Sequence, residues 1–124
     1  MSGPVKTIVG TDEAIARQNR DIDHFDSLLS AYRITKAEWE LKSEQAHVAH
    51  RNGANVDDAE ANALSEVHSK AMLALLMEPA VIPVHVREKI RIIHREELFD
   101  LYWRGAEVTA LLACDAERLL IGGA

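Results

Sequence analysis

The sequence contains few residues that break helices or cross-link the chain. Its 124 residues include one cysteine, three prolines and six glycines, and aromatic residues account for 5%. The single cysteine, Cys114, excludes an internal disulfide and fits a reducing compartment. The low glycine, proline and aromatic content disfavours a β-sandwich or β-barrel, which needs many turns and strand-forming residues. An all-α fold is therefore predicted.

Long apolar runs and an excess of positive charge are also absent. The richest apolar stretch, AMLALLM, is far shorter than the roughly 18 residues that a membrane span needs. The N-terminal MSGPVKTIVG lacks the long apolar core of a signal peptide. The formal net charge is −6, so no overall positive field attracts nucleic acid. We expect a cytoplasmic protein without a membrane partner, and nucleic acid is an unfavoured partner.

Helical periodicity begins near Thr11, whose hydroxyl can cap a helix and is followed by two acids. The pattern continues to Arg51, where Asn52-Gly53 supplies a stop. Its apolar residues form one row at Ile15, Ile22, Phe25, Leu29, Tyr32 and Trp39, and a second at Leu28, Ile34, Leu41 and Val48. We predict a flexible tail over residues 1–10 and a helix over 11–51, which a capping-box pattern at Thr35 could divide.

Two further helices are predicted, over residues 58–78 and 84–120. A capping-box pattern at Asp57 begins the shorter one and Pro79 ends it, since the residue before a proline is disfavoured in helical geometry. Pro83 can open the longer one. Gly105 weakens that helix by about 1 kcal/mol relative to alanine and could mark a bend. A short flexible tail over 121–124 closes the chain.

These helices predict one domain over residues 11–120 with an antiparallel three-helix arrangement, because the loops between them are short. At 1.5 Å per residue the middle helix is about 33 Å long, whereas its neighbours approach about 60 Å. The outer helices would then extend beyond any cover from their own chain and expose apolar residues. We therefore predict dimerisation into a helical bundle. The alternative is a compact monomer with folded-back helices.

The stretch EQAHVAH places Glu44, His47 and His50 at three-residue steps. Glu-x-x-His on a helix is the element from which di-iron bundles are built, and a homodimer could supply the second copy, with Glu38 or Glu66 as further ligands. His47 and His50 could instead bind zinc or nickel. Solvated side chains near a helix C-terminus explain the stretch without a metal. We assign no metal and no cofactor, and keep a metal-binding bundle as an alternative.

A basic row is formed by Arg87, Arg91 and Arg95 at four-residue steps. A DNA-binding accessory protein is therefore a second alternative. A solvated face that meets acids such as Asp57 and Asp58 is favoured, because the chain is acidic overall.

Catalytic patterns are missing: the sequence has no phosphate-binding glycine loop, dinucleotide fingerprint or nucleophile elbow. We predict no enzyme and assign no catalytic residue. Cys114 is expected in the core, and His68 is expected to be partly buried and hydrogen-bonded. Phe99 and Trp103 are expected to pack in the core or at an interface.

Residues 58–120 combine an acidic, alanine-rich helix ending in ALLMEP, the basic amphipathic REKIRIIHREEL, an aromatic at Trp103 and the leucine-rich LLACDAERL. This combination resembles small all-helical proteins of unassigned function encoded in alphaproteobacterial genomes. The Ile82-Pro83 pair departs from the threonine-led helix start expected there. The resemblance implies the helix boundaries and a bacterial source, and it supplies no active-site residue. We predict that the protein works by protein–protein interaction or self-association.

Overall fold

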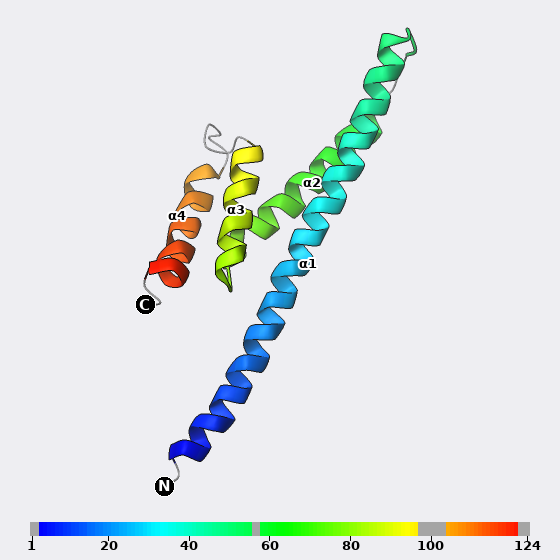
Figure 1. Ribbon diagram of the computed structural model, residues 1–124. Helices are drawn as coiled ribbons and strands as arrows, with labels where there is room; N and C mark the ends of the chain where they lie inside the picture. The colour runs from blue at the N-terminus through cyan, green and yellow to red at the C-terminus, as the bar shows by residue number, and fades with distance from the viewer. Residues whose placement is uncertain (1–2, 56–57, 97–103, 122–124) are drawn as a thin grey trace. The chain divides into compact units, whose positions relative to one another are not determined.

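The structure, a computed structural model, describes residues 3–55, 58–96 and 104–121 and is helical throughout its regular elements (Figure 1). The elements are α1 (Gly3–Arg51), α2 (Ala59–Met77), α3 (Pro83–Arg95), α4 (Gly105–Ala116) and the π-helical turn η2 (Glu117–Ile121). The prediction of an all-α fold is confirmed. Over the described residues, no helix combines the length and apolar character of a membrane span.

Helix α1 starts earlier than predicted and ends where predicted. It begins at Gly3 rather than Thr11, so residues 3–10 of the predicted tail are helical. Pro4 does not prevent this, because a proline in the first turn lacks only an N–H that has no partner within the helix. The helix continues past Thr35 without a break and ends at Arg51. Gly53 follows with φ +81°, the left-handed conformation that terminates helices.

Helix α2 matches its predicted range to within one residue at each end. Glu78 is extended, with φ −79° and ψ 130°, as expected for the residue before Pro79. Asp58 is the N-cap residue but makes no side-chain cap hydrogen bond, and Asp57 lies outside the described residues. The buried face comprises His68, Met72, Leu75 and Leu76.

The predicted single helix over residues 84–120 is wrong, because the structure has two helices there. Helix α3 ends at Arg95, and Glu96 leaves helical geometry at φ −88° and ψ 2°. Arg104 has φ 50° and ψ 11°, a left-handed conformation that cannot continue an α-helix, so α4 starts at Gly105. Phe99 and Trp103, which were expected to pack in the core or at an interface, lie outside the described residues.

Contacts within the chain group its residues into two compact units. Unit 1 comprises residues 1–26 and 79–124, and unit 2 comprises residues 27–78. Helix α1 contributes to both.

In unit 2, the second half of α1 pairs with α2. Lys42 Nζ lies 2.9 Å from Glu60 Oε2. Nearer the C-terminal end of α1, His50 Nε2 lies 3.4 Å from Asp58 Oδ1. Because later residues of α1 meet earlier residues of α2, the two helices are antiparallel. The buried apolar residues of this unit are Leu29, Tyr32, Met72, Leu75 and Leu76.

In unit 1, α3 packs with α4 and with the part of α1 around Phe25. Phe25 is fully buried and stacks on His85 at a centroid distance of 3.8 Å. The other buried apolar residues are Ala80, Val86, Ile92, Ile93 and Val108. Lys89 of α3 and Asp115 of α4 lie between them as a buried ion pair.

Candidate functional site

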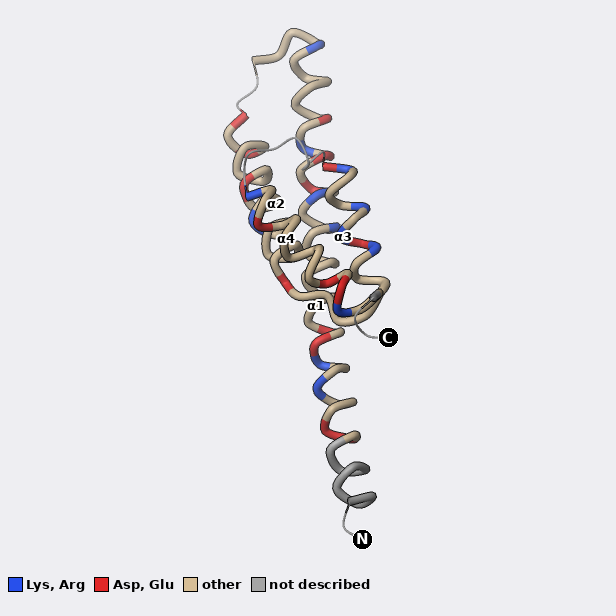
Figure 2. The backbone as a smooth tube through the Cα atoms, turned by 90° about the vertical axis from the view of Figure 1, so that its left-hand side faces the viewer, with Lys and Arg blue, Asp and Glu red and all other residues tan. Residues whose placement is uncertain are grey.

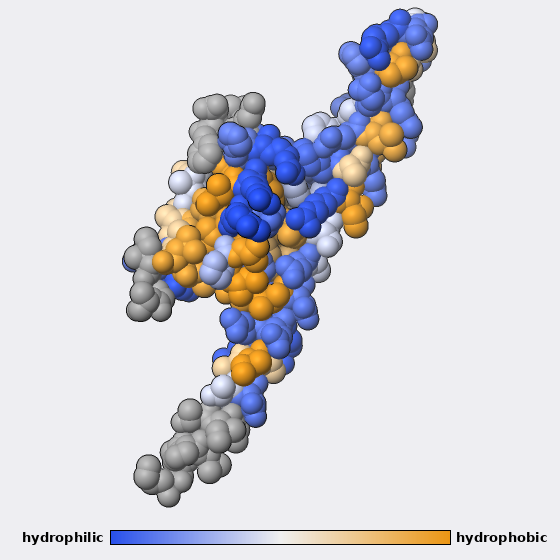
Figure 3. Space-filling view, in the orientation of Figure 1, coloured by the Kyte–Doolittle hydropathy of each residue, from blue (hydrophilic) through white to orange (hydrophobic). Residues whose placement is uncertain are grey.

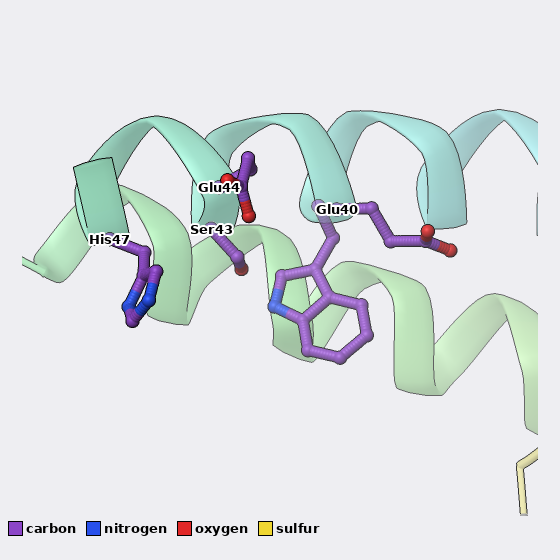
Figure 4. Close-up of a pocket in the computed structure, with 5 residues that line it drawn as sticks. Glu40, Ser43, Glu44 and His47 are labelled. Atoms are coloured by element: carbon purple, nitrogen blue, oxygen red, sulfur yellow. The ribbon is translucent and has the colours of Figure 1, made fainter.

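The predicted metal-binding stretch lies beside a shallow surface pocket of unit 2. Glu44 and His47 line this pocket together with Trp39, Glu40 and Ser43 (Figure 4). All five residues belong to α1; Glu40 extends along the helix, whereas His47 projects from it at the opposite end of the pocket (Figure 4). The pocket is therefore a gap between neighbouring side chains of one helix.

His50 is not brought together with His47. Its Nε2 atom lies 3.4 Å from Asp58 Oδ1, while Glu44 lies 3.9 Å from Arg51. Among the described residues, no three histidine, cysteine or acidic side chains are grouped closely enough to hold a metal ion. Within one copy, Glu44 and His47 therefore share a pocket that no third candidate ligand joins among these residues.

The most buried ionisable groups lie in unit 1 instead. Asp115 is fully buried, and its Oδ2 accepts a hydrogen bond from Lys89 Nζ at 2.5 Å. Its Oδ1 accepts hydrogen bonds from the backbone N–H of Ala80 at 3.2 Å and from Arg118 at 3.0 Å. Arg118 also donates to the carbonyl of Ala80. Asp115 thus connects the segment before α3, α3 itself and the end of α4, and every polar atom of its carboxylate is satisfied.

A histidine–carboxylate pair stands beside this cluster. His85 is 1% exposed, and its Nδ1 accepts a hydrogen bond from the Val81 N–H at 3.1 Å. Since Nδ1 accepts, the proton of the neutral ring is on Nε2, which donates to Asp26 Oδ1 at 3.1 Å. Burial lowers the pKa of His85, although the hydrogen bond to Asp26 opposes this shift. Both ring nitrogens are therefore occupied, and neither can take a proton from a substrate.

His68 occupies a comparable position in unit 2. It is 3% exposed, its ring stacks on Trp39 at 5.4 Å, and it meets Tyr32 at 5.2 Å. Its Nδ1 lies 3.5 Å from Thr35 Oγ1. The prediction of a buried, hydrogen-bonded histidine is confirmed, and the burial is greater than predicted.

Apolar side chains reach the surface along the α1–α2 pair (Figure 3). On α1, Ile34 is 58% exposed, Leu41 62% and Val48 38%. We call these three residues the α1 row. They follow at seven-residue steps, on the side of α1 away from Tyr32 and Trp39. Ile34, Leu41 and Val48, which belong to the second apolar row identified in the sequence, therefore form an exposed face of α1 and not part of its buried face.

Basic residues recur along helix α3 (Figure 2). Arg87, Arg91 and Arg95 are exposed, and two apolar residues of the same side, Val84 and Ile90, are 39% and 47% exposed. We call these five residues the α3 face. From the sequence, the basic row was expected to meet acids such as Asp57 and Asp58. In the structure Asp58 pairs with His50 and Glu60 pairs with Lys42, both inside unit 2.

Lys89, Asp115 and His85 were missed by sequence reasoning, and Cys114 was misplaced. The inward positions of α4 include Val108 and Asp115, and Cys114 is exposed because it precedes Asp115 by one residue. A signal was present: Lys89 sits among the apolar positions of α3, and Asp115 continues the three- and four-residue spacing of Val108 and Leu111.

Comparisons with protein-family models, with curated proteins and with solved structures give no match. The resemblance of residues 58–120 to the alphaproteobacterial proteins therefore stays a prediction.

Proposed function

We propose that this protein acts without catalysis, through protein–protein contact, and that its first partner is a second copy of itself. The observation that carries the proposal is the α1 row: Ile34, Leu41 and Val48 are exposed at 58%, 62% and 38%. Large apolar side chains exposed in series usually mark an interaction surface.

The spacing of the row supports a helical partner. Seven residues correspond to about 10.5 Å along a helix, so the row extends over about 21 Å. One apolar residue every seven positions matches one of the two apolar positions in the heptad repeat by which helices pack along one another. We infer a dimer as the simplest assembly, because closed two-fold pairs are the commonest oligomers.

The state of the buried histidine in unit 1 also favours a non-catalytic role. His85 has the burial and carboxylate partner of a catalytic base, but Val81 and Asp26 occupy its two nitrogens. We place the protein in the cytoplasm, where a single exposed cysteine such as Cys114 stays reduced.

Light scattering over a micromolar concentration series tests the proposal. The wild-type chain is expected to approach twice the monomer mass, and Leu41→Glu to remain monomeric because it places a charge in the middle of the row. Ile15→Glu is the matched control, since Ile15 is 50% exposed on α1 but lies in unit 1 and outside the row. A wild-type monomer at all concentrations, or equal loss of association in both variants, would overturn the proposal.

A further inference from the structure

Two of the three arginines of the α3 face have no carboxylate partner among the described residues of unit 1. Within the described residues of unit 1, Arg87 and Arg95 form no ion pair, and Arg91 lies 3.4 Å from Glu88 with its own side chain 56% exposed. The remaining basic residue of α3, Lys89, is neutralised by Asp115. A surface that covers the α3 face should therefore be acidic.

The same face requires apolar contact. Val84 lies in line with the arginine row and Ile90 lies beside it, and they are 39% and 47% exposed. Phosphates of a nucleic acid would satisfy the arginines but leave these two side chains uncovered. A protein surface with both carboxylates and apolar side chains covers all five residues, so the α3 face fits a protein better than DNA.

A surface of this kind is present on the chain itself. Glu38 and Glu44 lie three residues before and after Leu41, so they flank the α1 row on its two sides. Both side chains are exposed. Within the described residues of unit 2, Glu38 forms no ion pair, and the ion pair of Glu44 with Arg51 is long, at 3.9 Å. The α1 row thus combines an apolar centre with acidic edges.

We propose that the α3 face of one copy binds the α1 row of a second copy. The aliphatic stems of Arg87 and Arg91 would cover Leu41, and their guanidinium groups would reach the flanking carboxylates of Glu38 and Glu44. This proposal rests on the proposed self-association and names the two surfaces that meet. Two copies satisfy both pairs of surfaces when they bind reciprocally about a two-fold axis, which makes the interface isologous.

Charge reversal tests the pairing with two variants, Arg91→Glu and Glu38→Arg. Each is expected to weaken self-association about ten-fold or more, because like charges then face each other. An equimolar mixture of the two variants is expected to recover dimers, since one contact then pairs the two reversed charges and the other pairs the original Arg91 and Glu38. Sedimentation velocity of each variant and of the mixture measures this. Arg17→Glu and Glu13→Arg, both exposed on α1 in unit 1, are matched controls that should leave association unchanged.

The outcomes separate this proposal from the proposed function. If Leu41→Glu abolishes dimers while Arg91→Glu does not weaken them, the α1 rows bind each other, and the pairing is overturned while self-association stands. If the mixture fails to recover dimers, the pairing is likewise overturned. Wild-type binding of a 20-base-pair DNA duplex, steeply weakened by salt and lost in Arg91→Glu, would assign the α3 face to nucleic acid instead.

Discussion

The Nε2 atom of His85 lies 3.1 Å from Oδ1 of Asp26, and this contact joins α3 to α1 within unit 1. The neutral form of His85 suits the site, because its Nδ1 must accept the hydrogen bond of Val81. A doubly protonated ring would place a second donor against that N–H and a charge in a buried position.

Folding stability should therefore fall as the solution is acidified. The pKa of His85 is lowered in the folded state, so the unfolded chain binds a proton first as the pH falls below about 6.5. Stability is complete above that pH and is lost between it and the lower pKa of the folded state. Urea unfolding at pH 7.5 and 5.5 measures the loss. His85→Asn should reduce the difference between the two pH values, while His94→Gln, a change at an exposed histidine, should preserve it.

Replacing Lys89 by methionine should destabilise unit 1 strongly. Removing one member of a buried ion pair costs about 3–5 kcal/mol, because the remaining charge is left without its partner. The fully buried Asp115 would keep only Arg118 and the Ala80 N–H. Replacing both residues, as Lys89→Met with Asp115→Leu, should recover part of the loss. Thermal unfolding compares these variants with Arg91→Met, an exposed change expected within about 0.5 kcal/mol of wild type. An equal effect of Lys89→Met and Arg91→Met would contradict the buried pair.

Truncating Phe25 should remove much of the packing between α1 and α3. Phe25 is fully buried and stacks on His85, so Phe25→Ala is expected to cost about 3–5 kcal/mol. Ile15→Ala, ten residues earlier on the same helix and half exposed, should cost less than about 1 kcal/mol. Chemical denaturation of both variants tests whether α1 is anchored at Phe25.

Transition metal should not copurify with the protein. Glu44 and His47 share a pocket on one helix, but His50 lies with Asp58 and no third ligand joins them among the described residues. Elemental analysis of protein purified without a histidine tag measures iron, nickel and zinc. One metal ion per dimer, lost in His47→Ala but retained in His24→Ala, would instead show that a second copy completes the site.

The parts of the structure that follow from local sequence signals were predictable. The ends of α1 and α2 at Arg51 and Met77 agree with the Asn52-Gly53 and Pro79 signals, since these residues constrain the backbone directly. The division of the predicted third helix into α3 and α4 could not be predicted, because an apolar stripe over residues 84–120 is compatible with one helix or with two.

What divides that stripe is a contact between residues distant in sequence. On one straight helix the backbones of Lys89 and Asp115 would lie about 39 Å apart along the axis. In the structure, Lys89 Nζ lies 2.5 Å from Asp115 Oδ2. Only the folded chain shows that two opposite charges in apolar rows satisfy each other. The exposed α1 row was equally ambiguous, because periodicity identifies a helix face without stating what covers it.

Unit 1 is assembled from the two ends of the chain, while unit 2 is a single uninterrupted segment of residues 27–78. During synthesis the α1–α2 pair can therefore form as soon as Met77 has left the ribosome, since all its contacts are then available. Phe25 and Asp26 must wait for His85, which follows Asp26 by 59 residues. Closing so long a segment is slow relative to local helix pairing. We expect unit 1 to mature last, with Phe25 open to solvent and to chaperones in the nascent chain.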